Sequence, residues 1–383
     1  MSLPTVVVGG GYAGTALALA LHRKSIQFTL LKGPQSTQPR PDFAVGLWSP
    51  ALRCLRELGL LGELEKHGRY INASGYKSVA GEWLAQPSLM GSDIDFNACL
   101  MFVPKSKVFE VLQKELPEDS VRTNSVFDFF EDKGDRVEVH LQSGTTISGR
   151  LIVGADGMWS RVRQQCSPSF KGPSYQGYHV VQGICHQTFS EASFQTWGLN
   201  ARFAAVPTKD GQQWFATFIA PALSSQSNTE TSDSSSLKTS LIQRFESWHT
   251  PIASIIDATD DNDMLIENAW SFSKFPAMKK GNCVLIGDAV HLVDPVLAQG
   301  AGIAIEDAFY LGNNINCVLN NDFVENQQLN ERLKTLRNIS HLSQYLGQMR
   351  SKHRITIRDS LMQMSPSFIK TPLFDHIINA TVS

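Results

Sequence analysis

Residues 281–307, GNCVLIGDAVHLVDPVLAQGAGIAIED, place a carboxylate, a proline turn and a glycine-rich helix start in one continuous run. A short apolar strand, Cys283 to Ile286, brings Asp288 to its carboxyl end, where the carboxylate can accept hydrogen bonds from hydroxyl groups. Pro295 fixes the turn, and a helix is expected to start beyond it at Gln299, Gly300, Ala301 and Gly302. The free N–H groups and positive dipole end of such a helix favour an anionic partner. The run therefore predicts a flavin site, with Asp288 at the ribityl chain and the helix start at the ring.

The N-terminal residues predict a dinucleotide-binding strand, turn and helix. The strand Thr5–Val8 is followed by three spaced glycines and then by an apolar helix that extends to Leu21. The first glycine makes the tight turn, the second lets the backbone approach a pyrophosphate, and the third lets helix and strand pack closely. We assign five residues of this turn to the cofactor site: Gly9, Gly11, Tyr12, Ala13 and Gly14. Alone, this motif suits any enzyme that binds NAD or FAD.

A third motif lies between the other two. The apolar strand Leu151–Gly154 ends in an Asp156–Gly157 turn, and Ser160, Arg161 and Arg163 follow it. With these three motifs in this order, the chain resembles the single-component (group A) FAD-dependent monooxygenases, the para-hydroxybenzoate hydroxylase-like aromatic hydroxylases. The resemblance spans about residues 4–312.

The resemblance implies an α/β fold in which a Rossmann-like FAD-binding lobe is interleaved with an antiparallel β-sheet substrate lobe, with helices at the C-terminus. It also implies that Asp156 lies near the pyrophosphate. Because the sequence has no second glycine motif, NADPH or NADH would dock transiently in a surface cleft and reduce the FAD. Molecular oxygen would then form a flavin hydroperoxide, which transfers one oxygen atom to the substrate. The resemblance names no acid or base, so the catalytic residues are unknown.

Two lysines depart from the family pattern. The strand after the glycine turn usually ends in an acidic residue that accepts both ribose hydroxyls, but here it runs into Lys32, which has donors and no acceptor. Lys105 stands where the family usually has an arginine that reaches the FAD, and lysine lacks the planar fork of that side chain. We place both lysines at the FAD site. They leave one alternative open, a non-catalytic binding or scaffold protein with weakened FAD affinity. A second alternative is a flavin-dependent reductase that uses the same fold without oxygen insertion.

The expected lobes are interleaved along the chain. Three segments are assigned to the FAD-binding lobe (1–75, 104–165 and 270–320), two to the substrate-binding lobe (76–103 and 171–268), and one to a C-terminal helical region (321–383). The alternation in Gln212–Ile219 and the turn before it predict a hairpin. The serine-rich residues 224–236 are expected to form a loop.

Substrate contacts are expected from the strands of the substrate lobe. Gln182, Arg202 and Trp214 fall where the resemblance places the pocket. Aromatic residues on alternating strands bury area with or without a ligand, so sheet core is the competing interpretation. His291 lies inside the flavin motif, and we interpret it as a hydrogen-bonded structural residue.

Composition agrees with an enzyme of ordinary globular type, with 383 residues, 42% hydrophobic and 18% charged. The formal net charge of −2 gives no general attraction to nucleic acid. The six cysteines are scattered with no metal-ligand spacing, so we expect no metal. The first strand starts within a few residues of Met1, and no apolar run is long enough to span a bilayer, so a cytoplasmic location is expected.

The C-terminal region is basic and less similar to the family. Its lysines and arginines include Arg332, Lys334, Arg337, Arg350, Lys352, Arg354 and Arg358. It is expected either to cover the cofactor lobe with a solvated outer face or to make weak peripheral membrane contact, since basic and apolar faces together favour an anionic interface. The sequence thus predicts an FAD- and NAD(P)H-dependent monooxygenase that hydroxylates or epoxidises an aromatic or conjugated, apolar small molecule.

Overall fold

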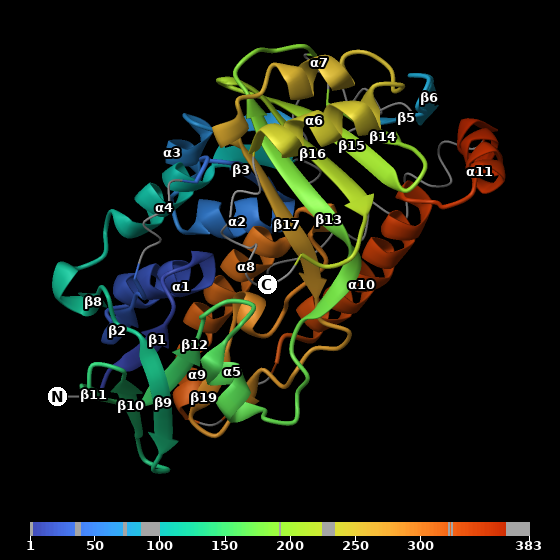
Figure 1. Ribbon diagram of the computed structural model, residues 1–383. Helices are drawn as coiled ribbons and strands as arrows, with labels where there is room; N and C mark the ends of the chain where they lie inside the picture. Colours follow the sequence, from blue (N-terminus) through green and yellow to red (C-terminus); the bar gives the residue numbers. More distant parts are fainter. Residues whose placement is uncertain are drawn as a thin grey trace.

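The computed structural model describes residues 3–34, 40–71, 75–85, 100–190, 193–223, 234–320, 322 and 325–364. Two large sheets dominate the molecule, and helices pack between and around them (Figure 1). This is the expected α/β architecture with C-terminal helices. None of the helices in the described residues has the length and apolar character needed to cross a membrane.

The first sheet has six strands and carries the three sequence motifs. Its order is β18 (Lys279–Lys280), β19 (Cys283–Leu285), β12 (Leu151–Gly154), β1 (Thr5–Val8), β2 (Phe28–Leu31) and β8 (Val121–Arg122). All pairs are parallel except that of β18 with β19. Every residue of β1, β12 and β19 is buried, as parallel strands covered on both faces require. The three motifs therefore leave neighbouring strands at one edge of the sheet.

Helices complete this lobe. α1 (Tyr12–Arg23) and α8 (Gly300–Asn313) pack against one another beside the sheet. Smaller helices surround them: α2 (Ser49–Glu57), α3 (Leu61–Glu65), α4 (Lys105–Gln113), α5 (Arg161–Cys166) and α9 (Ile315–Leu319). The helix expected from Gly300 begins at that residue.

The second sheet has seven strands and is antiparallel except where β5 meets β14. Its order is β17 (Met264–Ser271), β13 (Ser174–Cys185), β16 (Gly211–Ile219), β15 (Ala201–Thr208), β14 (Phe194–Trp197), β5 (Gly75–Lys77) and β6 (Trp83–Ala85). The expected hairpin is the β15–β16 pair. Helices α6 (Ser234–Phe245) and α7 (Ile252–Asp257) cover its outer face, at the top of Figure 1.

Two small sheets and two long helices fill the remaining space. The sheets are β3 (Ala44–Trp48) with β7 (Leu100–Pro104) and β4 (Arg69–Ile71), and the hairpin sheet of β9 (Phe127–Asp132), β10 (Val137–Leu141) and β11 (Thr146–Gly149). Helix α10 (Gln327–Gly347) runs along one side of the molecule to α11 (Lys352–Met364). Four short 3₁₀ turns lie at Glu118–Ser120, Asp261–Asp263, Gly287–Ala289 and Pro295–Leu297.

Residues 100–103, which were assigned to the substrate lobe, form part of β7, and β7 pairs with β3 and β4. The boundaries of the two lobes stay a prediction. One sequence prediction needs correction. The serine-rich loop was expected to reach residue 236, but α6 already begins at Ser234. The rest of that stretch, 224–233, lies outside the described residues, as does the final segment 365–383.

Candidate active site

The turn between β1 and α1 leaves no room for side chains at two of its glycines. Gly9 has a φ of 116°, and a Cβ there would collide with the carbonyl of Ala155. A Cβ on Gly14 would collide with the carbonyl of Gly9. At Gly11, by contrast, a Cβ would meet no atom within 4 Å. The turn is thus pressed against the end of β12 on one side and open on the other, as a group that approaches the backbone requires.

The Asp288 motif lies beside the turn between β1 and α1. Gly287 has a φ of 59°, and a Cβ there would lie 2.8 Å from the Cβ of Ala13 at the start of α1. A Cβ on Gly300 would lie 3.9 Å from Oδ1 of Asp288, so this carboxylate stands next to the N-terminus of α8. The fold therefore joins the first and third motifs into one site.

Asp288 is poised to accept hydrogen bonds. Within the described part of the chain its half-buried carboxylate accepts none. Burial, and then the charge of Asp307, raise the pKa of Asp288 to about 6. A carboxylate held in this state gains from donors that a bound ligand supplies.

Two orphaned polar atoms border the site. The Oη of Tyr12 and the Nε2 of Gln299 are buried, and neither finds a partner among the described residues. The Tyr12 ring stacks on Phe109 of α4 with centroids 4.6 Å apart, and burial raises the pKa of its hydroxyl. Because buried polar groups are nearly always paired, such atoms point to a ligand. Together with open Gly11 and unpaired Asp288, they fit FAD.

Asp156 holds the turn that follows β12 and the start of α5. Its carboxylate accepts hydrogen bonds from the Ser160 hydroxyl and from the N–H groups of Arg161 and Val162, at 2.8 and 3.2 Å. Asp156 therefore anchors the first turn of α5 with both of its oxygens. Its position beside Gly9 fits the predicted cofactor site.

Arg163, the last residue quoted in the third motif, links the motifs in a way that the sequence did not predict. Arg163 is buried and donates to the carbonyls of Ala289, at 3.1 Å, and Met158, at 2.7 Å. Its guanidinium also lies 4.9 Å from the centre of the Phe272 ring. Arg163 thereby ties α5 to the turn that carries Asp288.

The two departing lysines lie in different surroundings. The side chain of Lys32 passes along the glycine turn, since a Cβ on Gly10 would lie 2.6 Å from its Cγ. Its Nζ donates to Oε1 of Gln113 at 3.1 Å. Lys105 opens α4, with its Nζ 5.8 Å from the centre of the Phe43 ring. Burial lowers the pKa of Lys105, and the charge of Glu267 on β17 partly offsets this. Lys32 thus borders the glycine turn, and Lys105 lies near the seven-stranded sheet.

We expect Lys32→Glu to tighten FAD binding by about tenfold, because a carboxylate at the end of β2 can accept hydrogen bonds from ribose hydroxyls that lysine cannot accept. The measurement is a fluorescence titration of apoprotein with FAD. Lys24→Glu makes the same charge change at the exposed end of α1 and should leave the affinity unchanged. Unchanged or weaker binding by Lys32→Glu would place the ribose elsewhere.

A cavity of about 160 Å³ lies between the seven-stranded sheet and the turn at Pro295–Ala298. Most of its wall is apolar, with Trp48, Phe102, Val206, Phe215 and Leu297 among the lining residues. Ser343 of α10 closes one side. Asp294, which sequence reasoning missed, holds the turn: its Oδ1 accepts from the Tyr178 hydroxyl and from the Val296 N–H. The cavity thus lies directly beside the turn that leads into α8.

Arg202 is the positively charged residue among those that line this cavity. Its side chain is buried and donates from Nε to the Thr217 hydroxyl at 3.0 Å and from Nη1 to the Ser343 hydroxyl at 3.3 Å. Its Nη2 is buried without a partner, and it forms no ion pair with any residue that the structure describes. Burial lowers the pKa of Arg202. The free donor is therefore available to an acceptor in the cavity.

The other two expected substrate residues lie differently. Gln182 on β13 pairs with Phe215 and so faces the cavity side of the sheet, although it is not among the residues that line the cavity. Trp214 lies on the opposite face, fully buried with Phe203 and Phe245 beneath α6 and α7, and its Nε1 donates to Thr259 at 2.8 Å. Trp214 is sheet core because successive residues of a strand point to opposite faces. We therefore leave it out of the substrate site.

Two pairs of buried ionisable residues, each with one member on α8, stabilise the turns next to this helix. Arg332 of α10 pairs with Glu306 and donates to Oε1 of Gln299 at 3.3 Å. His291 has its Nδ1 2.8 Å from Oδ2 of Asp307, which also accepts from the Gly287 N–H. The structural interpretation of His291 agrees with these contacts. The Arg332–Glu306 pair could not be predicted from the sequence, because its members lie on different helices.

The comparisons with known proteins agree with an FAD-binding fold. The family described as FAD binding domain matches residues 2–327. The aurachin C monooxygenase/isomerase of Stigmatella aurantiaca is 29% identical over 315 residues, which cover 81% of this chain and 79% of the relative. The FAD-dependent urate hydroxylase of Klebsiella oxytoca is 25% identical over 316 residues, 81% of each chain. HpxO of Klebsiella pneumoniae, solved with FAD and uric acid, shares the fold with a TM-score of 0.85 at 21% identity, covering 100% of this chain and 98% of that one. The chain therefore belongs to this FAD-binding family and is a flavin-dependent monooxygenase.

Proposed function

We propose that the protein inserts one oxygen atom of molecular oxygen into an aromatic or conjugated, apolar small molecule, by hydroxylation or epoxidation, with NADPH or NADH as the reductant. The observation that carries the proposal is the position of the cavity. It adjoins the turn before α8, so a molecule inside it lies next to the predicted flavin site. The names of two relatives refer to aurachin C and to urate, and these names support a small cyclic substrate.

The residues divide into those that hold the cofactor and those that hold the substrate. Gly9, Gly11 and Gly14 would admit the pyrophosphate to the backbone, Asp288 would accept hydrogen bonds from the ribityl hydroxyls, and the start of α8 would stabilise negative charge on the ring. Bound FAD, once reduced, supplies the activation of oxygen. The apolar wall of the cavity would exclude water from the reacting atoms, and the turn at Pro295–Ala298 bounds the cavity on the side of the predicted flavin site.

Arg202 narrows the class of substrate. A buried cation with a free donor is costly unless an acceptor meets it. We infer that the substrate carries a carboxylate, phenolate or enolate oxygen that accepts from Nη2 of Arg202. The remaining wall is apolar and suits the rings or chain that bear this oxygen. Gln182 lies on the same face of the sheet and is proposed as a second polar contact.

The first experiment is an absorption spectrum of the purified protein, before and after addition of FAD and then of NADPH or NADH without oxygen. We expect flavin bands that bleach with the nicotinamide. After oxygen is admitted, candidate aromatic acids and phenols should yield a product that contains isotopically labelled oxygen from the gas. Bleaching with no oxygenated product from any of them would favour the reductase alternative. A colourless protein that takes up no FAD would favour the scaffold alternative, which rests on Lys32 and Lys105.

A further inference from the structure

Helix α11 exposes an apolar stripe to solvent. Ile357, Leu361 and Met364 are 51%, 59% and 81% exposed, and their spacing of four and three residues places them on one face of the helix. On the side of the helix that is turned inward, Arg358 and Met362 are buried. Large exposed side chains at helical spacing mark a surface that contacts another apolar phase.

Helix α10 continues this surface. Leu342 and Tyr345 are about half exposed, and Nη1 of Arg354 on α11 donates to the Tyr345 hydroxyl at 3.4 Å. Five of the ten large hydrophobic side chains that are exposed in the described residues therefore fall within residues 342–364. We call these five side chains, with Arg350, Lys352 and Arg354, the C-terminal face.

The C-terminal face is cationic. Residues 338–364 hold four lysines or arginines and one aspartate, in a chain with a formal net charge of −2. The aspartate, Asp359, pairs with Arg358. Arg350, Lys352 and Arg354 form no ion pair with any residue that the structure describes. The charges on this face are thus free to meet an external anion.

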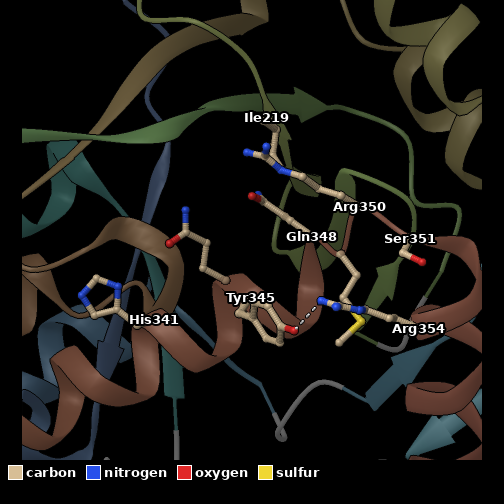
Figure 2. Close-up of a pocket in the computed structure, with 9 residues that line it drawn as sticks. Ile219, His341, Tyr345, Gln348, Arg350, Ser351 and Arg354 are labelled. Atoms are coloured by element: carbon tan, nitrogen blue, oxygen red, sulfur yellow. Dashed lines mark hydrogen bonds between the residues drawn. The ribbon is translucent and has the colours of Figure 1, made fainter.

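A groove beside the C-terminal end of α10 and the turn that leads into α11 is suited to such an anion. It encloses about 420 Å³ and is lined by residues that include His341, Tyr345, Gln348, Arg350 and Arg354. Figure 2 shows Arg350, from the turn between the helices, beside Ile219, and Arg354, from α11, reaching toward Tyr345 of α10. Two guanidinium groups at one groove suit the oxygen atoms of a phosphate, which arginine binds in a bidentate manner.

We propose that the C-terminal face docks the protein on bilayers that contain anionic phospholipids, with a lipid phosphate in the groove and the α11 stripe in the headgroup region. An amphipathic helix with basic residues beside its apolar stripe binds such interfaces weakly and reversibly. A second copy of the chain fits less well, because a symmetric dimer would set the same cationic patch against itself.

Docking here would bring the bilayer close to the substrate cavity, an inference that rests on the proposed function. Gln348 lines the groove, and its Nε2 donates at 2.6 Å to the hydroxyl of Thr217, which lines the cavity. Ser343, on the inner side of α10, lines the cavity as well. One layer of side chains therefore separates groove and cavity, and an apolar substrate dissolved in the bilayer would lie next to the cavity wall.

The test is co-sedimentation of the full chain with vesicles of phosphatidylglycerol and phosphatidylcholine in equal parts, against vesicles of phosphatidylcholine alone. We expect binding to the anionic vesicles that falls as salt is raised. Arg350→Gln with Arg354→Gln should lower the partition coefficient by about thirtyfold, since each basic residue near the surface contributes about 1 kcal/mol. Ile357→Gln with Leu361→Gln should lower it by roughly tenfold or more.

Lys24→Gln with Lys171→Gln removes the same charge from exposed sites elsewhere and should sediment like the parent chain. FAD content and circular dichroism report whether each variant is folded, independently of the proposed reaction. Equal binding to both vesicle types, or binding that neither double variant of the C-terminal face weakens, would overturn the proposal. Loss of a dimer in the Ile357→Gln, Leu361→Gln variant, measured by sedimentation equilibrium, would instead assign the face to self-association.

Discussion

Replacing Asp288 with alanine should weaken FAD binding by roughly ten- to a hundredfold, because it removes a carboxylate that accepts hydrogen bonds from the ribityl chain. The apoprotein should nevertheless be at least as stable as the parent. Burial raises the pKa of Asp288 to about 6, which means that folding disfavours its ionised form at neutral pH. Loss of the ligand together with unchanged or improved thermal stability would identify a residue kept for binding.

The measurements are an FAD titration and a thermal melt of the apoprotein. Asp128→Ala, on the exposed edge of β9, is the matched control and should change neither result. The FAD affinity of the parent should also fall as the pH drops below about 6, because the protonated carboxyl loses acceptor capacity, and this dependence should vanish in Asp288→Ala. Full retention of FAD by the variant would contradict the ribityl assignment.

Replacing Arg202 with methionine should raise the KM for an anionic aromatic substrate by about thirtyfold or more, since removal of one member of a buried charge pair costs 2 kcal/mol or more. FAD content and the flavin spectrum should not change, because the contacts of Arg202 are to Thr217 and Ser343 in the cavity wall. The fold should tolerate the change, since burial lowers the pKa of Arg202 and so penalises its charge in the absence of substrate.

The kinetic comparison uses whichever aromatic acids or phenols the parent enzyme converts, together with neutral analogues. Arg202→Lys keeps the charge and loses the fork, and we expect an intermediate KM. Arg136→Met removes an exposed arginine from the β9–β10 hairpin and serves as the control. If Arg202→Met left the KM of every anionic substrate unchanged, the anchor would have to be another group.

Local sequence patterns predicted much of the FAD lobe. Gly9 and Gly287 occupy backbone conformations with positive φ, and such requirements are visible in the sequence because glycine satisfies them best. The start of α8 at Gly300 was likewise predicted from the turn before it. These features depend on residues that are close in the chain, so a short stretch of sequence is enough to predict them.

Contacts between distant segments could not be predicted from the sequence. Alternation in Gln212–Ile219 predicts two faces but does not say which one meets the cavity, so Trp214 was assigned to the wrong face. Gln213 and Thr217 lie on the face opposite Trp214, but Gln212 lies on the same face as Trp214, so polarity did not separate the two faces. Arg163 and the Arg332–Glu306 pair depend on how helices meet, which no short pattern encodes.

The path of the chain through the seven-stranded sheet constrains how this enzyme can evolve. Strands β5 and β6 come from residues 75–85, while the other five come from residues 174–271, with the whole of β12 and α5 between them. Gln213 of β16 is also bonded to the backbone of Ala44 in β3 through both atoms of its amide. A single recombination event between two relatives would therefore split the sheet. New substrate preferences should arise by point substitutions on its inner face, and a graft of this sheet needs at least two inserted segments.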